Sequence, residues 1–294
     1  MDFEKRAMKV SIVSIIINIV LALFKLLAGI IAGSGAMISD SVHSASDVFS
    51  TFVVMIGIRI SAKESDTDHP YGHERMECVA AIILATILCI TGIGIGYNAV
   101  DFLLHIEENS KTVSEPGMLA LIAALVSIVV KEGMYWYTRI NAKRIDSGAL
   151  MADAWHHRSD ALSSVGAFIG IWFAKNGFIY ADSIASLVIC ILIIKASYDI
   201  FKDAVDKMVD KACDPELEAQ IMNFVKIQQG VMGIDLLRTR VFGNKIYVDL
   251  EISADGKKSL SETHGIAENV HDGIEKNFPK VKHIMVHVNP YKEN

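Results

Sequence analysis

Six long apolar segments, separated by short polar ones, dominate the first 207 residues of the chain. They cover residues 10–32, 36–61, 78–104, 117–138, 148–174 and 178–200. A helix needs about 20 predominantly apolar residues to cross the hydrocarbon core of a bilayer, and each segment reaches or approaches that length. The pattern therefore predicts an all-α transmembrane bundle of six helices over residues 1–207.

Residues 208–294 mix polar and apolar positions and predict elements in the order α-β-β-α-β. A helix over 214–227 is expected because Asp214 and Pro215 are typical of a helix start. Two strands, 234–241 and 245–252, are joined by a turn at Gly243. Ser259 begins a capping box that opens a second helix to about residue 277, and a last strand covers 281–288. This order favours an α+β domain with helices on one face of a three-stranded sheet.

Composition agrees with a membrane protein that carries a soluble domain. Of the 294 residues 52% are hydrophobic, and the mean hydropathy is +0.37. The net charge of −6 is modest, and no basic stripe suggests nucleic-acid binding. The four cysteines show no CxxC spacing, so they predict neither a disulfide framework nor a thiolate metal site.

Basic residues gather at alternate ends of the six segments, whereas the loops after the first, third and fifth segments are poor in positive charge. Short loops rich in Lys and Arg stay on the cytoplasmic side of a membrane. Both termini and the domain of residues 208–294 are therefore predicted to be cytoplasmic. The basic residues concerned are Lys5, Arg6 and Lys9; Lys63 and Arg75; Arg139, Lys143 and Arg144; and Lys202, Lys207 and Lys211.

Two apolar segments carry a histidine followed four residues later by an aspartate: His43 with Asp47, and His156 with Asp160. Residues i and i+4 share one face of a helix. Ionisable side chains at membrane depth cost about 2.5–3.5 kcal/mol each on insertion scales, which marks them as functional. Two imidazoles and two carboxylates suit a tetrahedral divalent metal. The alternative is that these groups only join helices through hydrogen bonds.

The residues beside these pairs are expected to support the site. Asp40 and Asp153 lie one turn before the two histidines, and they either line the same pathway or accept hydrogen bonds from the imidazoles. His157 and Arg158 are expected to point away from the ligand face, toward the cytoplasmic interface. The two His-x-x-x-Asp pairs therefore define the predicted site.

Two further clusters of metal-binding side chains lie outside the predicted spans. Asp66, His69 and His73 share the loop after the second segment, where they suit either a metal site or an ordinary hydrophilic loop. The soluble domain contains a larger set, and both readings stay open there because surface histidines are common without a metal. This set is Asp235, Asp249, His264, His271, His283, His287 and Asn289.

The ligand pattern favours transport over catalysis, so no enzymatic activity is expected. The chain has no His-Glu-x-x-His motif, and a metal with four protein ligands leaves no open position for an activated water molecule. Histidine must be deprotonated to bind metal, so protons and metal compete, which is a physical basis for metal/proton antiport. A membrane metal sensor without transport and a membrane metalloenzyme are the alternatives.

Three of these features together resemble the cation diffusion facilitator family: the pair His43/Asp47, the run from Asp153 to Ser164, and the loop from Asp68 to Arg75. The resemblance covers nearly the full chain. It implies six spans followed by a metallochaperone-like cytoplasmic domain. It also implies a homodimer in the bacterial plasma membrane that exports divalent metal from the cytoplasm in exchange for protons, by alternating access.

The resemblance implies the same membrane and loop sites as the spacing. The transport site would be His43, Asp47, His156 and Asp160, and the loop site would be Asp66, His69 and His73. The nitrogen and oxygen ligands of the transport site suit Zn²⁺ first, and Cd²⁺, Co²⁺ and Fe²⁺ also fit. Mn²⁺ prefers sites richer in oxygen. Zn²⁺ is therefore the expected transported and regulatory ion.

The resemblance also implies a metal site in the cytoplasmic domain and a salt bridge at the hinge between membrane and domain. In the metal site, His264 and His287 fall where ligands are expected. Asp235 and Asp249 occupy places that can carry histidine, and Asn289 occupies one that can carry aspartate. The implied hinge salt bridge joins Arg75 and Asp210.

Overall fold

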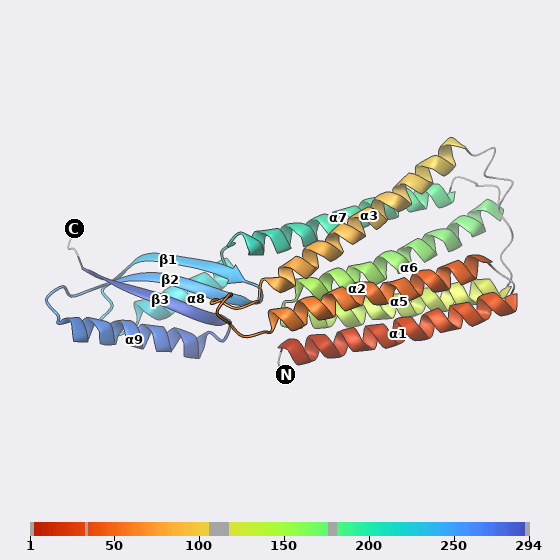
Figure 1. Ribbon diagram of the computed structural model, residues 1–294. Helices are drawn as coiled ribbons and strands as arrows, with labels where there is room; N and C mark the ends of the chain where they lie inside the picture. Colours follow the sequence, from red (N-terminus) through yellow and green to blue (C-terminus); the bar gives the residue numbers. More distant parts are fainter. Residues whose placement is uncertain (1–2, 33–34, 106–117, 176–180, 292–294) are drawn as a thin grey trace. The chain divides into compact units, whose positions relative to one another are not determined.

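The computed structural model in Figure 1 describes residues 3–32, 35–105, 118–175 and 181–291. Inside the helices, many side chains in residues 35–46, 118–124, 163–175 and 181–185, including those of Asp40 and His43, lie outside the described part. The chain divides into two compact units, Met1–Val205 and Asp206–Asn294. Each unit is considered by itself.

Six long helices account for the first unit, at the places where the apolar segments predict them. They are α1 (Phe3–Ala32), α2 (Gly35–Ser61), α3 (Met76–Leu104), α5 (Met118–Ile145), α6 (Gly148–Lys175) and α7 (Ala181–Met208). Several extend beyond the predicted segments, because polar turns such as those at the start of α1 remain helical although hydropathy detects only the apolar part.

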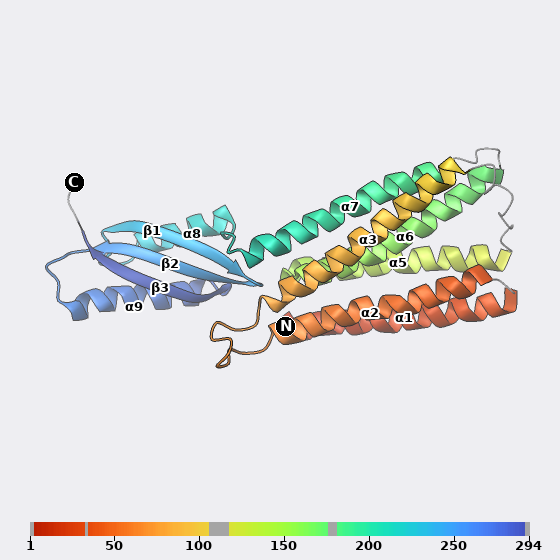
Figure 2. The same ribbon diagram turned by 45° about the horizontal axis from the view of Figure 1, so that its top comes forward.

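Helix α6 has a central place among these helices. It packs against α5, α3 and α2, while α1 packs against α2 and α5 (Figures 1 and 2). Small residues allow α3 and α7 to approach closely, since a Cβ atom at Gly96 would lie 2.6 Å from Cys190 Sγ. Side chains carried by α2, α5 and α6 can therefore meet inside the bundle.

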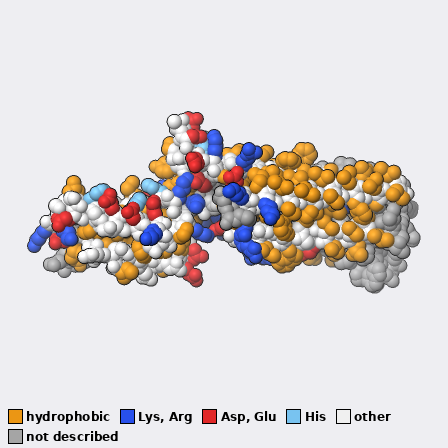
Figure 3. Space-filling model, turned by 90° about the horizontal axis from the view of Figure 1, so that it is seen from below, with side chains coloured by type: hydrophobic (Ala, Val, Ile, Leu, Met, Phe, Trp, Pro, Cys, Tyr) orange, Lys and Arg blue, Asp and Glu red, His pale blue; other side chains and the backbone are white. Residues whose placement is uncertain are grey.

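The outer surface of the helical unit is apolar. Figure 3 shows hydrophobic side chains over most of the visible face of this unit, with Lys and Arg gathered near one end. Large side chains such as Ile16, Leu27 and Ile191 are more than half exposed. Of the described helices, Phe3–Ile31 and Met76–Leu104 are long and apolar enough to cross a membrane by length and composition alone. Such a surface suits contact with lipid.

The second unit is a three-stranded sheet with two helices, as the sequence predicts. Its elements are α8 (Pro215–Lys226), β1 (Gly233–Phe242), β2 (Lys245–Ala254), α9 (Leu260–Asn277) and β3 (Val281–Pro290). The strand order is β1-β2-β3, with β1 and β2 antiparallel and β2 and β3 parallel. The predicted order α-β-β-α-β is confirmed.

Local signals and one shared core explain this arrangement. Ser259 and Glu262 form the predicted capping box at the start of α9. Gly243 turns the hairpin with φ of 62°, a left-handed conformation that favours glycine. Val248 and Leu250 on β2 are buried in one cluster with side chains of α8 and α9. Alternation along β2 therefore leaves the intervening positions on the helix-free face of the sheet.

Candidate metal centres

A buried cluster joins two helices of the bundle. Asp47 of α2 and His156 and Asp160 of α6 each offer a ligand atom, and these atoms lie within 4.8 Å of one another. His156 Nε2 lies 3.4 Å from Asp47 Oδ1 and makes no hydrogen bond. A buried imidazole nitrogen without a hydrogen bond, beside two carboxylates, fits a metal ligand. His43 belongs to α2 one turn before Asp47, but its side chain lies outside the described residues.

Lys131 of α5 occupies the same cluster, and the spacing of histidine and aspartate gave no indication of it. Its Nζ atom donates hydrogen bonds to Asp47 Oδ2 at 2.5 Å and to Asp160 Oδ2 at 2.9 Å. The side chains of Lys131 and Asp47 are both only 2% exposed. The sequence does contain a signal for Lys131, because an ionisable residue in the middle of a predicted span is by itself a functional-site hypothesis.

The residues next to the cluster form a second buried polar contact. Thr51 Oγ1 donates to Asp153 Oδ1 at 3.2 Å, and His157 Nε2 lies 3.5 Å from Asp153 Oδ2. The expectation that His157 points toward the cytoplasmic interface is wrong, since its side chain is fully buried. Because α6 packs against three helices, a position off the ligand face meets another helix rather than solvent.

Arg158, the other residue expected at the interface, is partly exposed. Its guanidinium carbon lies 4.3 Å from the centre of the Tyr135 ring, and one of its nitrogens lies 3.8 Å from Glu132 Oε1. Both partners belong to α5, and cation–π contacts of this kind hold a guanidinium against an aromatic face. Arg158 therefore links α6 to α5 beside the buried cluster.

The loop between α2 and α3 brings Asp66, His69 and His73 together. Their ligand atoms lie within 4.8 Å of one another. His69 Nδ1 lies 3.3 Å from Asp66 Oδ1, and His73 Nε2 lies 3.4 Å from Asp66 Oδ2. The loop also holds its own geometry, because the backbone N–H of His69 donates to Asp66 Oδ1 at 2.8 Å. That hydrogen bond lowers the pKa of the Asp66 carboxyl below its ordinary value.

One imidazole in the loop is oriented for binding. His73 Nδ1 lies 3.2 Å from the backbone oxygen of Glu64, which can accept a hydrogen bond only from a protonated nitrogen. That contact leaves Nε2, the nitrogen facing Asp66, free to act as a ligand in the neutral ring. His73 is buried, whereas Asp66 and His69 are exposed. The three side chains therefore form a group at the surface that could hold a metal ion.

In the second unit, a polar cluster lies on the helix-free face of the sheet. Asn289 Nδ2 donates to Asp235 Oδ2 at 3.0 Å and to Glu251 Oε2 at 3.2 Å, while Asn289 Oδ1 lies 3.1 Å from His287 Nε2. The Ser253 hydroxyl donates to Asp235 Oδ1 at 2.6 Å and lowers the pKa of that carboxyl. Glu251 is new to the cluster, and strand alternation from Asp249 would have indicated it.

The other predicted ligands of this unit do not join the cluster. His264 is exposed on α9 and lies 3.4 Å from Glu268 Oε1, because it projects from the helix rather than from the sheet. Asp249 pairs in register with Met285 on β3, two positions along β2 from Glu251. Within the described residues of this unit, no three His, Cys, Asp or Glu ligand atoms lie within 4.8 Å of one another. Arg75 and Asp210 belong to different units, so their salt bridge stays a prediction.

Comparison with known proteins identifies the family. The profile of the cation efflux transmembrane domain matches residues 11–209, and that of the cation efflux protein cytoplasmic domain matches residues 213–291. The chain belongs to the cation diffusion facilitator family. Its fold class, a helical transmembrane bundle followed by an α+β domain, is the predicted one. Membership in this family also indicates that the chain is a membrane protein that takes part in cation efflux.

Several relatives of this family member have names that describe metal handling. The manganese efflux system protein MneP of Bacillus subtilis is 34% identical, with 99% of this chain and 98% of the relative covered. Metal tolerance protein C1 of Arabidopsis thaliana is also 34% identical, with 93% of this chain and 60% of the relative covered. The solved domain MamM-CTD 215-293 is 22% identical and covers 26% of this chain and 96% of its own, with a TM-score of 0.26.

Proposed function

We propose that this protein exports divalent metal cations from the cytoplasm in exchange for protons, as a homodimer that works by alternating access. The observation that carries the proposal is the buried cluster of Asp47, His156 and Asp160, with His43 one turn before Asp47. Its ligands come from two separate helices, so a relative movement of α2 and α6 changes both the geometry of the site and its access.

Competition between metal and protons supports the exchange. The neutral imidazole of His156 binds metal through Nε2, and protonation of that atom removes the lone pair that the metal needs. The two carboxylates respond in the same direction, since protonation weakens their hold on a cation. A site that takes up metal on one side and protons on the other can therefore couple the two flows.

The choice of metal has two candidates with different support. Two nitrogen and two oxygen ligands, with His43 included, suit tetrahedral Zn²⁺. Mn²⁺ is the second candidate, because two relatives of similar length are named for manganese efflux: MneP at 34% identity and MneS at 30%. Both are small divalent cations of the first transition row, so availability and site geometry decide between them.

The loop site and the cluster of the soluble unit fit a supporting part in this function. The loop site of Asp66, His69 and His73 lies at the surface, with Asp66 and His69 exposed, so it would capture metal before transport. The soluble unit matches the cytoplasmic domain of cation efflux proteins, and the name of that domain profile refers to a dimer. This match favours a homodimer. Metal binding to this unit would bias the transporter only to the extent that its affinity differs between the two states.

Flux through full-length protein in proteoliposomes tests the proposal. Zn²⁺ and Mn²⁺ are offered separately and in competition, and uptake is followed with a metal-sensitive dye under an imposed pH gradient. Asp160→Ala should abolish flux, while Asp101→Ala, the same change at an exposed carboxylate of α3, should leave it intact. Unchanged flux in Asp160→Ala would rule out the assigned site. Metal binding without flux in the natural protein would favour the sensor instead.

A further inference from the structure

The ammonium group of Lys131 lies between two of the proposed metal ligands. It contacts one oxygen of Asp47 and one oxygen of Asp160, at 2.5 Å and 2.9 Å. These carboxylates come from α2 and α6, whereas Lys131 comes from α5. One cation from a third helix thus bridges two proposed ligands from the other two.

The ammonium and a metal ion exclude each other at this place. A transition metal needs its carboxylate oxygens at about 2.0–2.2 Å and its imidazole nitrogen at about 2.0–2.1 Å. An ion at those distances from Asp47 Oδ2 and Asp160 Oδ2 would overlap the Nζ atom, which contacts the same two oxygens. The lysine stem has four carbons and several rotatable bonds, so Nζ can leave without backbone movement.

We propose that Lys131 is a tethered counter-cation, which fills the transport site while no metal is bound and withdraws when a divalent ion enters. This inference rests on the proposed function, because it assigns a role within the same site. Lys131 is a positioning and competing residue rather than a metal ligand, since an ammonium has no lone pair to offer.

Such a cation stabilises the metal-free site while its two carboxylates are charged. Two carboxylates facing each other inside a bundle repel strongly when nothing lies between them, because the low dielectric of the interior does not screen their charge. Metal release and proton uptake need not coincide, and Lys131 would pair with Asp47 and Asp160 whenever they are charged and hold no metal. The pairing also keeps α2, α5 and α6 together at the site.

The tethered cation also favours divalent ions over monovalent ones. A monovalent ion that replaced the ammonium would exchange one positive charge for another and gain little. A divalent ion brings twice the charge and also gains the nitrogen of His156, which makes no hydrogen bond in the metal-free site. Lys131 therefore lowers the affinity of the site for any cation, and only an ion that binds more strongly than the ammonium replaces it.

Equilibrium metal affinity of the full-length protein tests the role of Lys131. Zn²⁺ and Mn²⁺ titrations at one fixed pH would compare the natural protein with Lys131→Met, which removes the competitor, and Lys131→Arg, which keeps a cation. Lys131→Met should bind metal tighter by about tenfold or more, a change of roughly 1.4 kcal/mol. Lys131→Arg should stay close to the natural protein. Glu132→Gln, a charge removed at the next residue outside the cluster, should also stay close.

Other outcomes separate this inference from the proposed function. The loop site remains in Asp160→Ala, so the transport site is the class of metal sites that this variant loses. If Lys131→Met binds metal at that class equally or more weakly, the tethered-cation role is overturned and the transport site stands. If Asp160→Ala binds as well as the natural protein, the proposed function itself fails. Lys131→Gln provides the same test should Lys131→Met not fold, because the amide keeps a hydrogen-bond donor without the charge. A purely structural lysine would lower the melting temperature of both variants without raising affinity.

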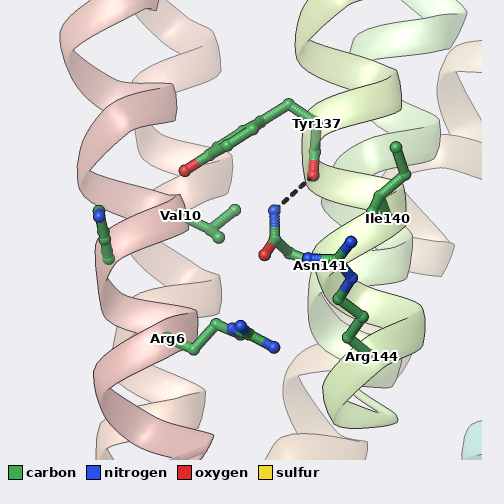
Figure 4. Close-up of a pocket in the computed structure, with 7 residues that line it drawn as sticks. Arg6, Val10, Tyr137, Ile140, Asn141 and Arg144 are labelled. Carbon is green, nitrogen blue, oxygen red and sulfur yellow. Dashed lines mark hydrogen bonds between the residues drawn. The ribbon is translucent and has the colours of Figure 1, made fainter. Parts of the chain in front are cut away.

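A separate basic cavity of about 370 Å³ lies between the first turns of α1 and the last turns of α5. Arg6 points from α1 toward α5, with Arg144 and Asn141 across the gap (Figure 4). Lys9 adds a third cation to the lining. Among the residues that the structure describes, no carboxylate forms an ion pair with Arg6, Lys9 or Arg144. Three cations facing one cavity without a described counter-ion leave room for an anion.

We infer that this cavity binds the phosphodiester head group of an anionic phospholipid. Tyr137 and Ile140 line the same cavity and are exposed, and Ile12 and Ile16 continue the apolar surface farther along α1. A lipid can place its phosphate among the three cations and its acyl chains along these side chains. Free phosphate offers the same charge without the acyl chains.

Thermal unfolding of the full-length protein in nanodiscs tests the lipid site. Phosphatidylglycerol should raise the melting temperature relative to phosphatidylcholine, and Arg6→Gln with Arg144→Gln should remove most of that increase. Lys143→Gln removes a basic residue of the same helix end that does not line the cavity, so it should behave like the natural protein. An increase of equal size in all three proteins would overturn the site. An equal increase from inorganic phosphate in phosphatidylcholine discs would overturn the lipid assignment.

Discussion

The buried cluster and the loop site use nearly the same side chains in opposite surroundings. Both join histidine and aspartate, and in both the ligand atoms lie within 4.8 Å of one another. The Asp47 side chain is 2% exposed, whereas that of Asp66 is 38% exposed. Each group also has a lysine beside it, but Lys131 of the buried cluster is 2% exposed, whereas Lys63, whose Nζ lies 3.5 Å from Asp66 Oδ2, is 65% exposed.

This difference teaches that burial, more than residue type, decides what such a group does. Asp66 and His69 are exposed to water, which stabilises both side chains without a metal. Inside the bundle the Asp47 and Asp160 side chains are only 2% and 9% exposed, so each carboxylate needs either a paired cation or a proton. The buried cluster therefore suits an exchange between cations, and the loop suits capture.

The largest effect is expected from Asp47→Asn. The change removes a charged ligand and one of the two acceptors of Lys131. Removing groups that merely orient a ligand already weakens metal sites by about 10–100-fold, so metal flux in proteoliposomes should fall by about 100-fold or more. Flux near the natural level would contradict the assignment of Asp47 to the transport path, whatever the effect on folding.

A smaller effect is expected from Asp66→Asn, the same substitution at the exposed site. It should weaken metal binding to the loop by about tenfold and slow transport without abolishing it, because the loop only supplies the ion. Titration in the Asp160→Ala background isolates the loop by removing the transport site. If Asp66→Asn abolished flux as fully as Asp47→Asn does, the proposal that the loop only captures metal for the buried cluster would be contradicted.

The smallest effect concerns the protonation of Asp66. The backbone N–H of His69 lowers the pKa of this carboxyl, so its charged form is favoured in the folded loop. The resulting stabilisation is present above the pKa of the unfolded chain, near 3.9, and is lost as pH falls through the lower folded value. Carboxyl ¹³C NMR of labelled full-length protein should therefore show Asp66 titrating below its value in the unfolded chain. A titration at or above the unfolded value would contradict the loop geometry.

Much of the fold followed from local patterns. Six apolar segments predicted six helices, and the turn at Gly243 and the capping box at Ser259 appear where the sequence places them. These signals are local, because a helix or a hairpin depends on neighbours within a few residues. The prediction about His157 depended on which surface α6 presents to other helices, and there the local pattern did not suffice.

The sequence by itself determined which residues share a helix face. The spacing of His156 and Asp160 sets them side by side through backbone geometry alone. Only the tertiary structure decided that Asp47 completes the group and that Lys131 lies between the two carboxylates. In the sequence, Lys131 is 84 residues from Asp47 and 29 residues from Asp160. Those contacts depend on the packing of α2, α5 and α6. Hydrophobic spacing shows that helices form, but the fit of their surfaces decides which charged side chains meet.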